Sequence, residues 1–384
     1  MVDLKDYVKI CKFGGSSVAN EPIGGAIKKI IENDSKRQLI VVSAPGKDKK
    51  YTDKITDVLI KASLNKKFFD YYMKYIENRF QEFSTALSVD INLKKEIRKI
   101  KYHYRIFKNK SYLISRGEYL TAKIFAKYLK IDFIDASKII KFNKNGKIKN
   151  KTYKVIAALL KKHKRILIPG FYGSNIFGKI KVMSRGGSDI TGAICAKAIN
   201  NSIYENWTDV DGVYNCFEDK SKLFSYISYD DLQFLSFYGA SVLNYKCANI
   251  CKDRIVIIKN TFNYKQKGTI VYNFGKQIEY AKTKKQGIEL VFSENFMIDK
   301  LIKKARVEVL CNTAIFNQRR LIIAINKGYS NDKIIQSLIE NAKQVKQVEL
   351  CAYISKDYPK NECCNMILLS HKNESYRYIT VNYI

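Results

Sequence analysis

The sequence predicts an α/β protein, an αβα sandwich around a largely parallel central sheet, followed by a small α+β region. Through about the first 280 residues, short apolar runs of strand length alternate with helical patterns. Such strand–helix–strand repetition is typical of a parallel sheet covered on both faces. The last 100 or so residues instead show the pattern of small β-α-β units. We therefore expect two domains, 1–280 and 281–384.

Each expected strand of the first domain is a short, mainly apolar run: Val8–Phe13, Leu39–Ser43, Ile131–Asp135, Ile166–Ile168, Ser202–Glu205 and Ile255–Lys259. The expected helices between them are Lys54–Leu64, Gly117–Leu129, Thr152–Lys162 and Asp189–Ile199. The Lys- and Tyr-rich segment 66–110 has helical spacing and no strand pattern, which indicates a helical insertion.

The second domain is expected to contain six strands: Ile288–Phe292, Val307–Leu310, Leu321–Ile325, Gln347–Ile354, Met366–Leu369 and Tyr378–Val381. Its expected helices end at Lys304 and cover Lys333–Ala342. Pro and Gly are too sparse to mark a linker, so the polar stretch Tyr280–Gln286 is the best candidate for the domain boundary.

Composition limits the function classes. The chain carries 69 basic and 36 acidic residues, a net charge of +33, which could indicate nucleic-acid binding. The lysines are spread over the whole chain, however, and this favours the imprint of an AT-rich genome. The start of the chain lacks the apolar stretch of a signal peptide, and no apolar run is long enough to span a membrane. Nine cysteines without zinc spacing fit reduced thiols in the cytoplasm.

Two glycine loops carry the chemistry. In the first, Lys12 begins the motif KFGGSS, which directly follows the first strand. Its two glycines let the backbone approach a bulky anion, and the two serines offer hydroxyl and N–H groups, although a plain tight turn is the favoured explanation of this motif taken alone. In the second, Arg185 begins RGGSD, and its planar donors suit a carboxylate. The structural alternative makes Ser188 a helix N-cap and Asp189 a partner of the helix dipole.

Two further motifs have ambiguous interpretations when taken alone. Ser115–Glu118 (SRGE) begins a helix and could be a capping box. Trp207–Tyr214 (WTDVDGVY) follows a strand, where open α/β sheets bind nucleotides. Its Asp-x-Asp-Gly lacks the later ligands of a calcium loop. The chain also has no Walker-type Gly-x-x-x-x-Gly-Lys-Ser/Thr motif.

Taken together, these motifs resemble the aspartate kinase family, a branch of the amino-acid kinase superfamily. KFGGSSVA from Lys12 is similar to that family's KFGGTSVA, and SRGE matches its S-x-G-E. PGF from Pro169, together with RGGSD, matches a second pair, and WTDVDGVY is unchanged. FYGASVL from Phe237 resembles FGA-x-VL. The similarity runs in the family's order from about residue 8 to 275.

The resemblance implies transfer of the γ-phosphate of ATP to the β-carboxylate of L-aspartate, giving 4-phospho-L-aspartate for lysine, threonine and methionine synthesis. Lys12 would stabilise the migrating phosphoryl group, and Asp189 would orient Lys12. Arg185 would bind the α-carboxylate of aspartate, and Glu118 would bind its ammonium. Implied further substrate contacts are Thr56, Phe171 and Ser188. Implied ATP contacts, besides Lys12, are Gly14, Gly15, Ser16, Ser17, Gly186, Gly187, Thr208, Asp209 and Tyr214. Mg²⁺ would arrive with ATP, without protein ligands.

The chain also departs from the family pattern. Asp219 stands where many members have an arginine near the ATP phosphates, and Ser241 and Asn244 replace a lysine and a histidine. Lys220, Lys222 and Lys246 are candidate substitutes for these cations, so the departures put nucleotide affinity in question. Residues 287–384 resemble only weakly the two ACT domains that usually end the family. We expect a reduced pair that builds a homodimer or higher homo-oligomer, with weakened feedback by lysine or threonine.

Three alternatives remain open from the sequence. The same fold could phosphorylate glutamate, N-acetylglutamate or carbamate, because pocket depth decides the acceptor. The chain could instead be a non-catalytic amino-acid sensor, which the missing nucleotide cations would favour. Retention of Lys12, Arg185 and Asp189 together favours an enzyme. Nucleic-acid binding is the remaining alternative.

Overall fold

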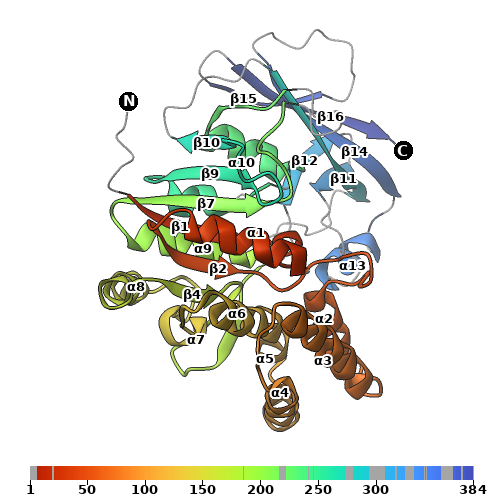
Figure 1. Cartoon of the computed structure of the whole chain (residues 1–384). Helices are drawn as coiled ribbons and strands as arrows, with labels where there is room; N and C mark the ends of the chain where they lie inside the picture. The colour runs from red at the N-terminus through yellow and green to blue at the C-terminus, as the bar shows by residue number, and fades with distance from the viewer. Residues whose placement is uncertain are drawn as a thin grey trace. The chain divides into compact units, whose positions relative to one another are not determined.

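The computed structural model describes residues 7–19, 21–184, 186–215, 222–240, 242–244, 246–272, 280–293, 308–315, 318–324, 333–340, 342, 344–355, 366–372 and 375–383. They form two compact units (Figure 1). The first unit comprises the described residues within 1–213, 223–230 and 242–275, and the second unit those within 214–222, 231–241 and 276–384. No helix among these residues is long and apolar enough to cross a lipid bilayer.

The first unit is built on an eight-stranded sheet with the order β3-β4-β2-β1-β7-β9-β10-β8. Its strands are β1 (Val8–Phe13), β2 (Arg37–Val42), β3 (Asp132–Phe133), β4 (Ile166–Pro169), β7 (Ser202–Thr208), β8 (Tyr226–Ser228), β9 (Ile255–Asn260) and β10 (Thr269–Tyr272). Neighbours from β3 to β9 are parallel, and only β10 runs antiparallel to β9. A separate antiparallel pair is formed by β5 (Tyr172–Ser174) and β6 (Ile180–Val182). The predicted largely parallel sheet is confirmed.

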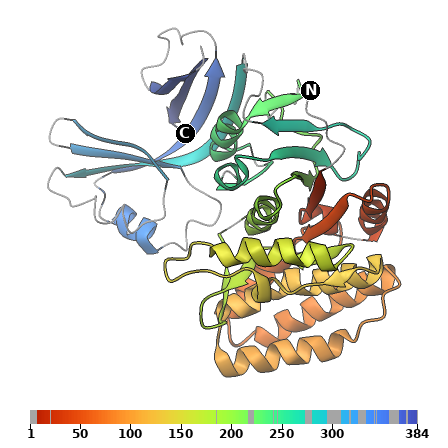
Figure 2. The same cartoon turned by 90° about the vertical axis from the view of Figure 1, so that its left-hand side faces the viewer.

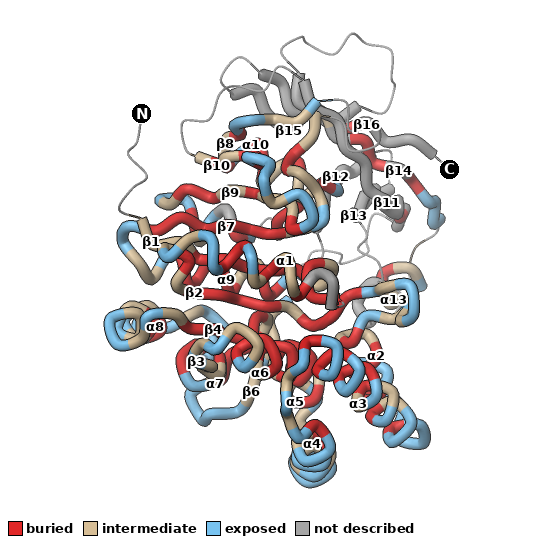
Figure 3. Tube along the Cα trace, in the orientation of Figure 1, coloured by how far each residue is buried: buried red, intermediate tan, exposed pale blue. Residues whose placement is uncertain are grey.

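Helices cover both faces of this sheet (Figures 1 and 2). The helices of the first unit are α1 (Glu21–Glu32), α2 (Ile55–Leu64), α3 (Phe69–Ala86), α4 (Leu93–Phe107), α5 (Lys110–Ile114), α6 (Arg116–Leu129), α7 (Ala136–Ile139), α8 (Asn150–Lys162), α9 (Gly187–Ala198) and α11 (Lys246–Cys251), whereas most of α10 (Tyr229–Phe237) belongs to the second unit. Side chains alternate along a strand. Cys11 and Phe13 of β1 therefore pack with α1, α2, α3 and α6, and α9 packs against β1, β2 and β7. Figure 3 shows the buried strands between these layers. The predicted insertion 66–110 is helical, as α3 and α4.

The second unit contains a six-stranded antiparallel sheet with the order β12-β13-β11-β14-β16-β15. Its elements are β11 (Tyr280–Ser293), β12 (Glu308–Ile315), β13 (Gln318–Ala324), α13 (Lys333–Glu340), β14 (Gln344–Ser355), β15 (Met366–Lys372) and β16 (Ser375–Tyr383). The polar stretch Tyr280–Gln286, expected as the domain boundary, is itself a strand, because it forms the first half of β11 and pairs with β14. The helix expected to end at Lys304 falls outside the described residues.

Candidate active site

The loops that carry the sequence motifs start at one edge of the first unit's sheet. The strand register pairs Phe13 with Val42 and with Trp207, and it pairs Val42 with Pro169. The carboxyl ends of β1, β2, β4 and β7 therefore lie side by side. In open α/β sheets, ligands bind in the crevice outside this edge. The topology thus brings the KFGG, PGF and WTD motifs together from distant parts of the chain.

Lys12, the last but one residue of β1, is 7% exposed and reaches the first turn of α9. Its Nζ atom lies 2.6 Å from Asp189 Oδ1. The other carboxylate oxygen of Asp189 accepts a hydrogen bond of 3.0 Å from the backbone N–H of Asn244. The structure thus agrees with the expectation that Lys12 and Asp189 meet, and Asp189 fixes where the ammonium points.

The turn after β1 requires glycines because neighbouring protein atoms lie too close to Gly14 and Gly15 for a side chain. The backbone N–H of Gly14 donates to the carbonyl of Trp207 at 3.1 Å. A Cβ atom added at Gly14 would lie 3.3 Å from Lys12 Nζ, and one at Gly15 would lie 3.0 Å from the Ala44 carbonyl oxygen. Since Gly15 has a φ of −62°, its lack of a side chain serves packing and not an unusual backbone conformation. A bulky residue at either position would displace the lysine or the neighbouring loop.

The serines of this motif differ in their surroundings. Ser16 and Ser17 lie in a short 3₁₀ turn, Ser16–Val18. Ser16 is half-buried. Ser17 is buried, and its hydroxyl lies 2.7 Å from the Thr261 hydroxyl. The Ser17 hydroxyl is therefore engaged within the fold. A phosphate at this turn would have to accept from the backbone N–H of Ser17 instead.

The second glycine loop packs tightly against the PGF motif. Gly186, with a φ of +77°, is the N-cap of α9, so the alternative that made Ser188 the cap is wrong. A Cβ atom at Gly170 would lie 2.6 Å from Ser188 Cβ, and one at Gly187 would lie 2.7 Å from the Phe171 ring. Phe171 also donates its backbone N–H to Thr191 Oγ1 at 3.0 Å. Phe171, Ser188 and Asp189 therefore share one end of α9.

Glu118 is buried in the first turn of α6. Burial raises its pKa to about 8, although backbone hydrogen bonds from its own N–H and from Ala44, and the charge of Arg116, act in the other direction. Its Oε2 atom has no hydrogen-bond partner. The alternative capping box is wrong, because the Ser115 hydroxyl donates instead to the carbonyl of Tyr112 at 2.7 Å. Glu118 is a buried carboxyl group that lacks a bonded cation.

The nearby cation is committed elsewhere. Arg116 donates to the carbonyl of Tyr112 at 3.1 Å and to the hydroxyl of Ser115 at 2.9 Å. Its guanidinium also lies over three tyrosine rings, those of Tyr112, Tyr119 and Tyr172, at 4.4–5.2 Å from the ring centres. These contacts hold Arg116 in place, while Glu118 Oε2 has no hydrogen-bond partner.

The remaining predicted site residues are less tightly defined. Thr208 ends β7, and its hydroxyl donates to the exposed Asp209 carboxylate at 3.0 Å. Thr56 is half-buried in the first turn of α2. Tyr214 belongs to the second unit. The residues of the motifs and departures that fall outside the described ranges are Arg185, Asp219, Lys220 and Ser241.

One buried ion pair was not foreseen from the motifs. Glu205, in the middle of β7, accepts hydrogen bonds from Arg37 Nε at 2.8 Å and from Trp207 Nε1 at 3.1 Å. The pair joins β2 to β7 across β1, and so it supports the strands whose ends form the site. Its signal in the sequence is a lone glutamate inside an apolar strand.

Comparisons with known proteins identify the family of the chain. Residues 8–260 match the amino acid kinase family, and the chain belongs to that family. It is similar to aspartokinases: it is 31% identical to Aspartokinase 3 of Bacillus subtilis over 289 residues, 69% of this chain and 63% of that protein. The match therefore spans less than two thirds of that relative.

Solved structures extend the likeness to the whole chain. The crystal structure of the Clostridium acetobutylicum aspartate kinase has a TM-score of 0.77 and 29% identity, covering 98% of this chain and 96% of that one. That of E. coli aspartokinase III in complex with aspartate and ADP has a TM-score of 0.78 at 19% identity, which shows the shared fold. The resemblance to aspartate kinases inferred from the motifs is confirmed.

Proposed function

We propose that the protein transfers the γ-phosphoryl group of ATP to the β-carboxylate of L-aspartate, producing 4-phospho-L-aspartate and ADP. The observation that carries this proposal is the 2.6 Å pair of Lys12 and Asp189 beside the Gly14 turn. It supplies a positioned cation at the edge of the sheet where a phosphate can approach the backbone.

The chemistry needs positioning more than proton transfer. A β-carboxylate with a reference pKa of about 3.9 is already ionised at neutral pH, so no general base is required. One of its oxygens forms a bond to the γ-phosphorus while the bond from phosphorus to the bridging oxygen breaks, and that electron pair leaves with ADP. Lys12 neutralises charge on the transferring group, and Asp189 holds the ammonium in position.

The acceptor is recognised as a free α-amino acid. The buried Glu118 has no bonded cation, so the ammonium of aspartate is a suitable partner. Arg185 is assigned to the α-carboxylate, because guanidinium binds carboxylates in a bidentate manner. Thr56, Phe171 and Ser188 are assigned as further substrate contacts. An N-acetylated acceptor lacks this ammonium, which makes N-acetylglutamate a poorer candidate.

The nucleotide is assigned to Thr208, Asp209 and Tyr214, with its phosphates at the two glycine loops. Mg²⁺ bound to ATP would neutralise the phosphate oxygens that it bridges. Such an ion keeps several waters and needs few protein ligands. The Gly14–Gly15 turn beside Lys12 is assigned to the phosphates because an added Cβ at Gly14 would lie 3.3 Å from Lys12 Nζ, so the turn keeps the ammonium position free of side chains.

The second unit is proposed to be a reduced ACT-like region, approximately residues 281–384, that builds a homodimer or higher homo-oligomer. We infer that feedback by lysine or threonine is weakened, because the region resembles ACT domains only weakly. Titration of the purified enzyme with each amino acid tests this, and potent inhibition by either would reject it. The cytoplasm is proposed as the location, supported by the buried cysteines Cys11, Cys195, Cys247 and Cys251, which form no disulfide bond.

The proposed activity is tested by measuring ADP release with a panel of amino acids, trapping the acyl phosphate with hydroxylamine. We expect turnover with L-aspartate, and we expect Lys12→Ala to reduce it at least about a hundredfold through lost transition-state stabilisation. Lys28→Ala, which removes a half-exposed lysine on α1, is the matched control. Equal turnover by Lys12→Ala, or a preference for another acceptor, would contradict the proposal.

A further inference from the structure

Arg79 is a charged residue on the buried face of α3. The apolar face of this helix is formed by Phe69, Met73, Ile76, Phe80 and Phe83. Arg79 falls within the same helical spacing and is only 2% exposed. An arginine in such a place usually has a specific set of partners, because burying an unpaired charge is costly.

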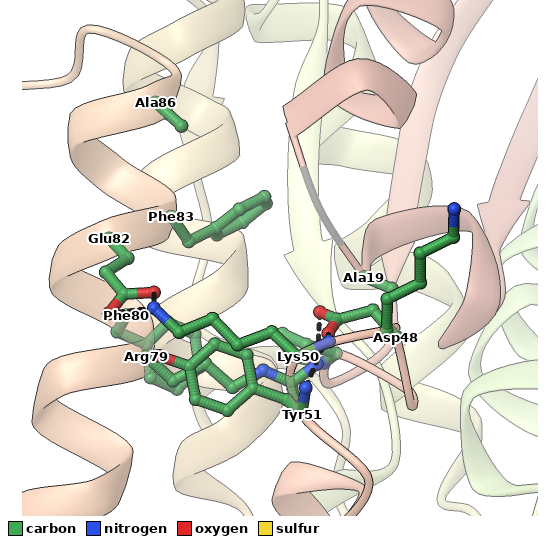
Figure 4. A pocket seen from close by; sticks show the side chains of 11 residues that line it. Ala19, Asp48, Lys50, Tyr51, Arg79, Phe80, Glu82, Phe83 and Ala86 are labelled. Carbon is green, nitrogen blue, oxygen red and sulfur yellow. Dashed lines mark hydrogen bonds and ion pairs between the residues drawn. The ribbon is translucent and has the colours of Figure 1, made fainter.

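Its partners all lie on the loop that follows β2. Arg79 Nη1 donates to the Asp53 carbonyl at 3.0 Å. Its Nη2 donates to the Gly46 carbonyl and approaches the Asp48 carboxylate at 3.4 Å. The guanidinium also lies over the ring of Tyr51, 4.8 Å from its centre (Figure 4). The guanidinium of Arg79 thus binds the segment 46–53 through Gly46, Asp48 and Asp53 and also lies over Tyr51.

This loop in turn packs on the candidate active site. The Gly46 N–H donates to the Gly15 carbonyl at 2.8 Å, and the Ser43 N–H donates to the Phe13 carbonyl at 3.1 Å. A Cβ atom at Gly46 would lie only 2.9 Å from the carbonyl carbon of Gly15. Ala44, in the same loop, makes a backbone hydrogen bond to Glu118. The loop therefore lies between Arg79 and both the glycine turn and the buried carboxyl group.

We propose that Arg79 is a positioning residue, which holds the loop 43–53 so that the Gly14–Gly15 turn and Glu118 are correctly placed for aspartate phosphorylation. This inference rests on the proposed function. It gives the helical insertion 66–110, which carries Arg79, a role in the reaction, although Arg79 itself is not assigned to contact aspartate or ATP. The loop 43–53 is the segment that links Arg79 to the Gly14–Gly15 turn and to Glu118.

The choice of arginine supports positioning over simple packing. Its planar donors can reach two carbonyls and a carboxylate together, which a lysine ammonium on a flexible stem cannot reproduce. Arg79 Nε is buried without a hydrogen-bond partner, and an unpaired buried donor destabilises the fold. An apolar side chain would avoid this cost, so stability alone does not favour arginine here.

The test compares Arg79→Ala and Arg79→Lys with the wild-type chain. We expect kcat/KM for aspartate to fall about ten- to a hundredfold in Arg79→Ala, because misplacement of catalytic groups by about 1 Å costs this much. Arg79→Lys should keep less than half of the wild-type value. The affinity for ADP, which lacks the γ-phosphoryl group and is assigned also to the loops after β7 and before α9, should fall by a clearly smaller factor than kcat/KM for aspartate. Arg105→Met is the matched control, because Arg105 lies on the same insertion and pairs with Asp70 at the surface.

Chemical rescue separates positioning from stability. Arg79 lines a cavity of about 430 Å³ together with Pro45, Phe80 and Phe83 (Figure 4). Truncation to alanine would open the guanidinium position to this cavity. Methylguanidinium at millimolar concentration should then restore part of kcat/KM in Arg79→Ala, and methylammonium should not.

Three outcomes would overturn the inference: turnover of Arg79→Ala within twofold of wild type, an equal loss of ADP affinity, or a loss of activity without rescue. If Arg79→Ala does not fold, a wild-type kcat/KM in Arg79→Lys overturns it equally. Absence of aspartate-dependent turnover in the wild-type chain, with ADP still bound, would instead contradict the proposed function. The two failures are thus distinguished in one series of assays.

Discussion

Replacing Glu118 by glutamine should make the protein more stable at neutral pH while it weakens aspartate binding. Folding raises the pKa of this carboxyl group from an ordinary 4.5 to about 8, chiefly by burial. Between these values the folded state binds more protons than the unfolded state. The contribution of Glu118 to stability is therefore fully present below pH 4.5 and is lost as the pH rises towards 8. Glutamine cannot ionise, so the variant escapes this loss.

The size of the effect follows from the shift. One pKa unit corresponds to about 1.4 kcal/mol. At pH 5 the variant should gain only about 1 kcal/mol over the wild type, and at pH 7 roughly 3 kcal/mol. For a unit of this size, the gain at pH 7 corresponds to a rise of roughly 6–12 °C in Tm. The lost ammonium contact should at the same time raise KM for aspartate at least about tenfold.

Thermal unfolding of both proteins, followed by circular dichroism from pH 5 to pH 8.5 without substrate, measures this difference. Glu32→Gln, which changes an exposed carboxylate at the end of α1, serves as the control. We expect the difference in Tm between Glu118→Gln and wild type to grow with pH. A constant difference across the range, or a less stable variant at pH 8, would refute the assignment of Glu118 as a buried carboxyl group without a cation.

Two other substitutions test the framework of the site. Arg37→Met leaves the buried Glu205 without its main partner and should cost about 3–5 kcal/mol of unfolding free energy, measured by urea denaturation; a loss below about 1 kcal/mol would contradict the role of this pair. Gly170→Ala places a Cβ atom 2.6 Å from Ser188 Cβ and should lower kcat/KM for aspartate at least about tenfold. Gly25→Ala, where an added Cβ meets nothing within 4 Å, should leave activity unchanged, and equal activities of the two alanine variants would disprove the required close approach.

Much of the fold was predictable because its signals are local. The apolar run Val8–Phe13 forms β1 with the predicted bounds, and the helical spacing of 54–64 gives α2 to within one residue. Parallel order follows from the alternation of strands and helices. The strand at Tyr280–Gln286 was missed, because there polar residues form half of a long strand. Pairing with β14 outweighed the local polar pattern there.

The site was predictable only in part. Lys12 and Asp189 could be assigned together because the resemblance to aspartate kinases implies a role for both at the transferred phosphate, and the two side chains do pair in the structure. Arg79 has no motif, and its only signal is a charge at the helical spacing of an apolar face. The capping alternatives for Ser115 and Ser188 also failed, since local sequence cannot show which acceptor or backbone conformation a serine meets.

The sequence by itself determined the order of elements, the glycine loops and the family to which the chain belongs. These depend on residue type and spacing, which the sequence contains directly. Only the tertiary structure decided that Lys12 meets Asp189, that Glu118 lacks a cation and that Arg79 holds the loop after β2. Those properties depend on burial and on distances between residues far apart in the chain, and both arise only when the sheet and its helices have packed.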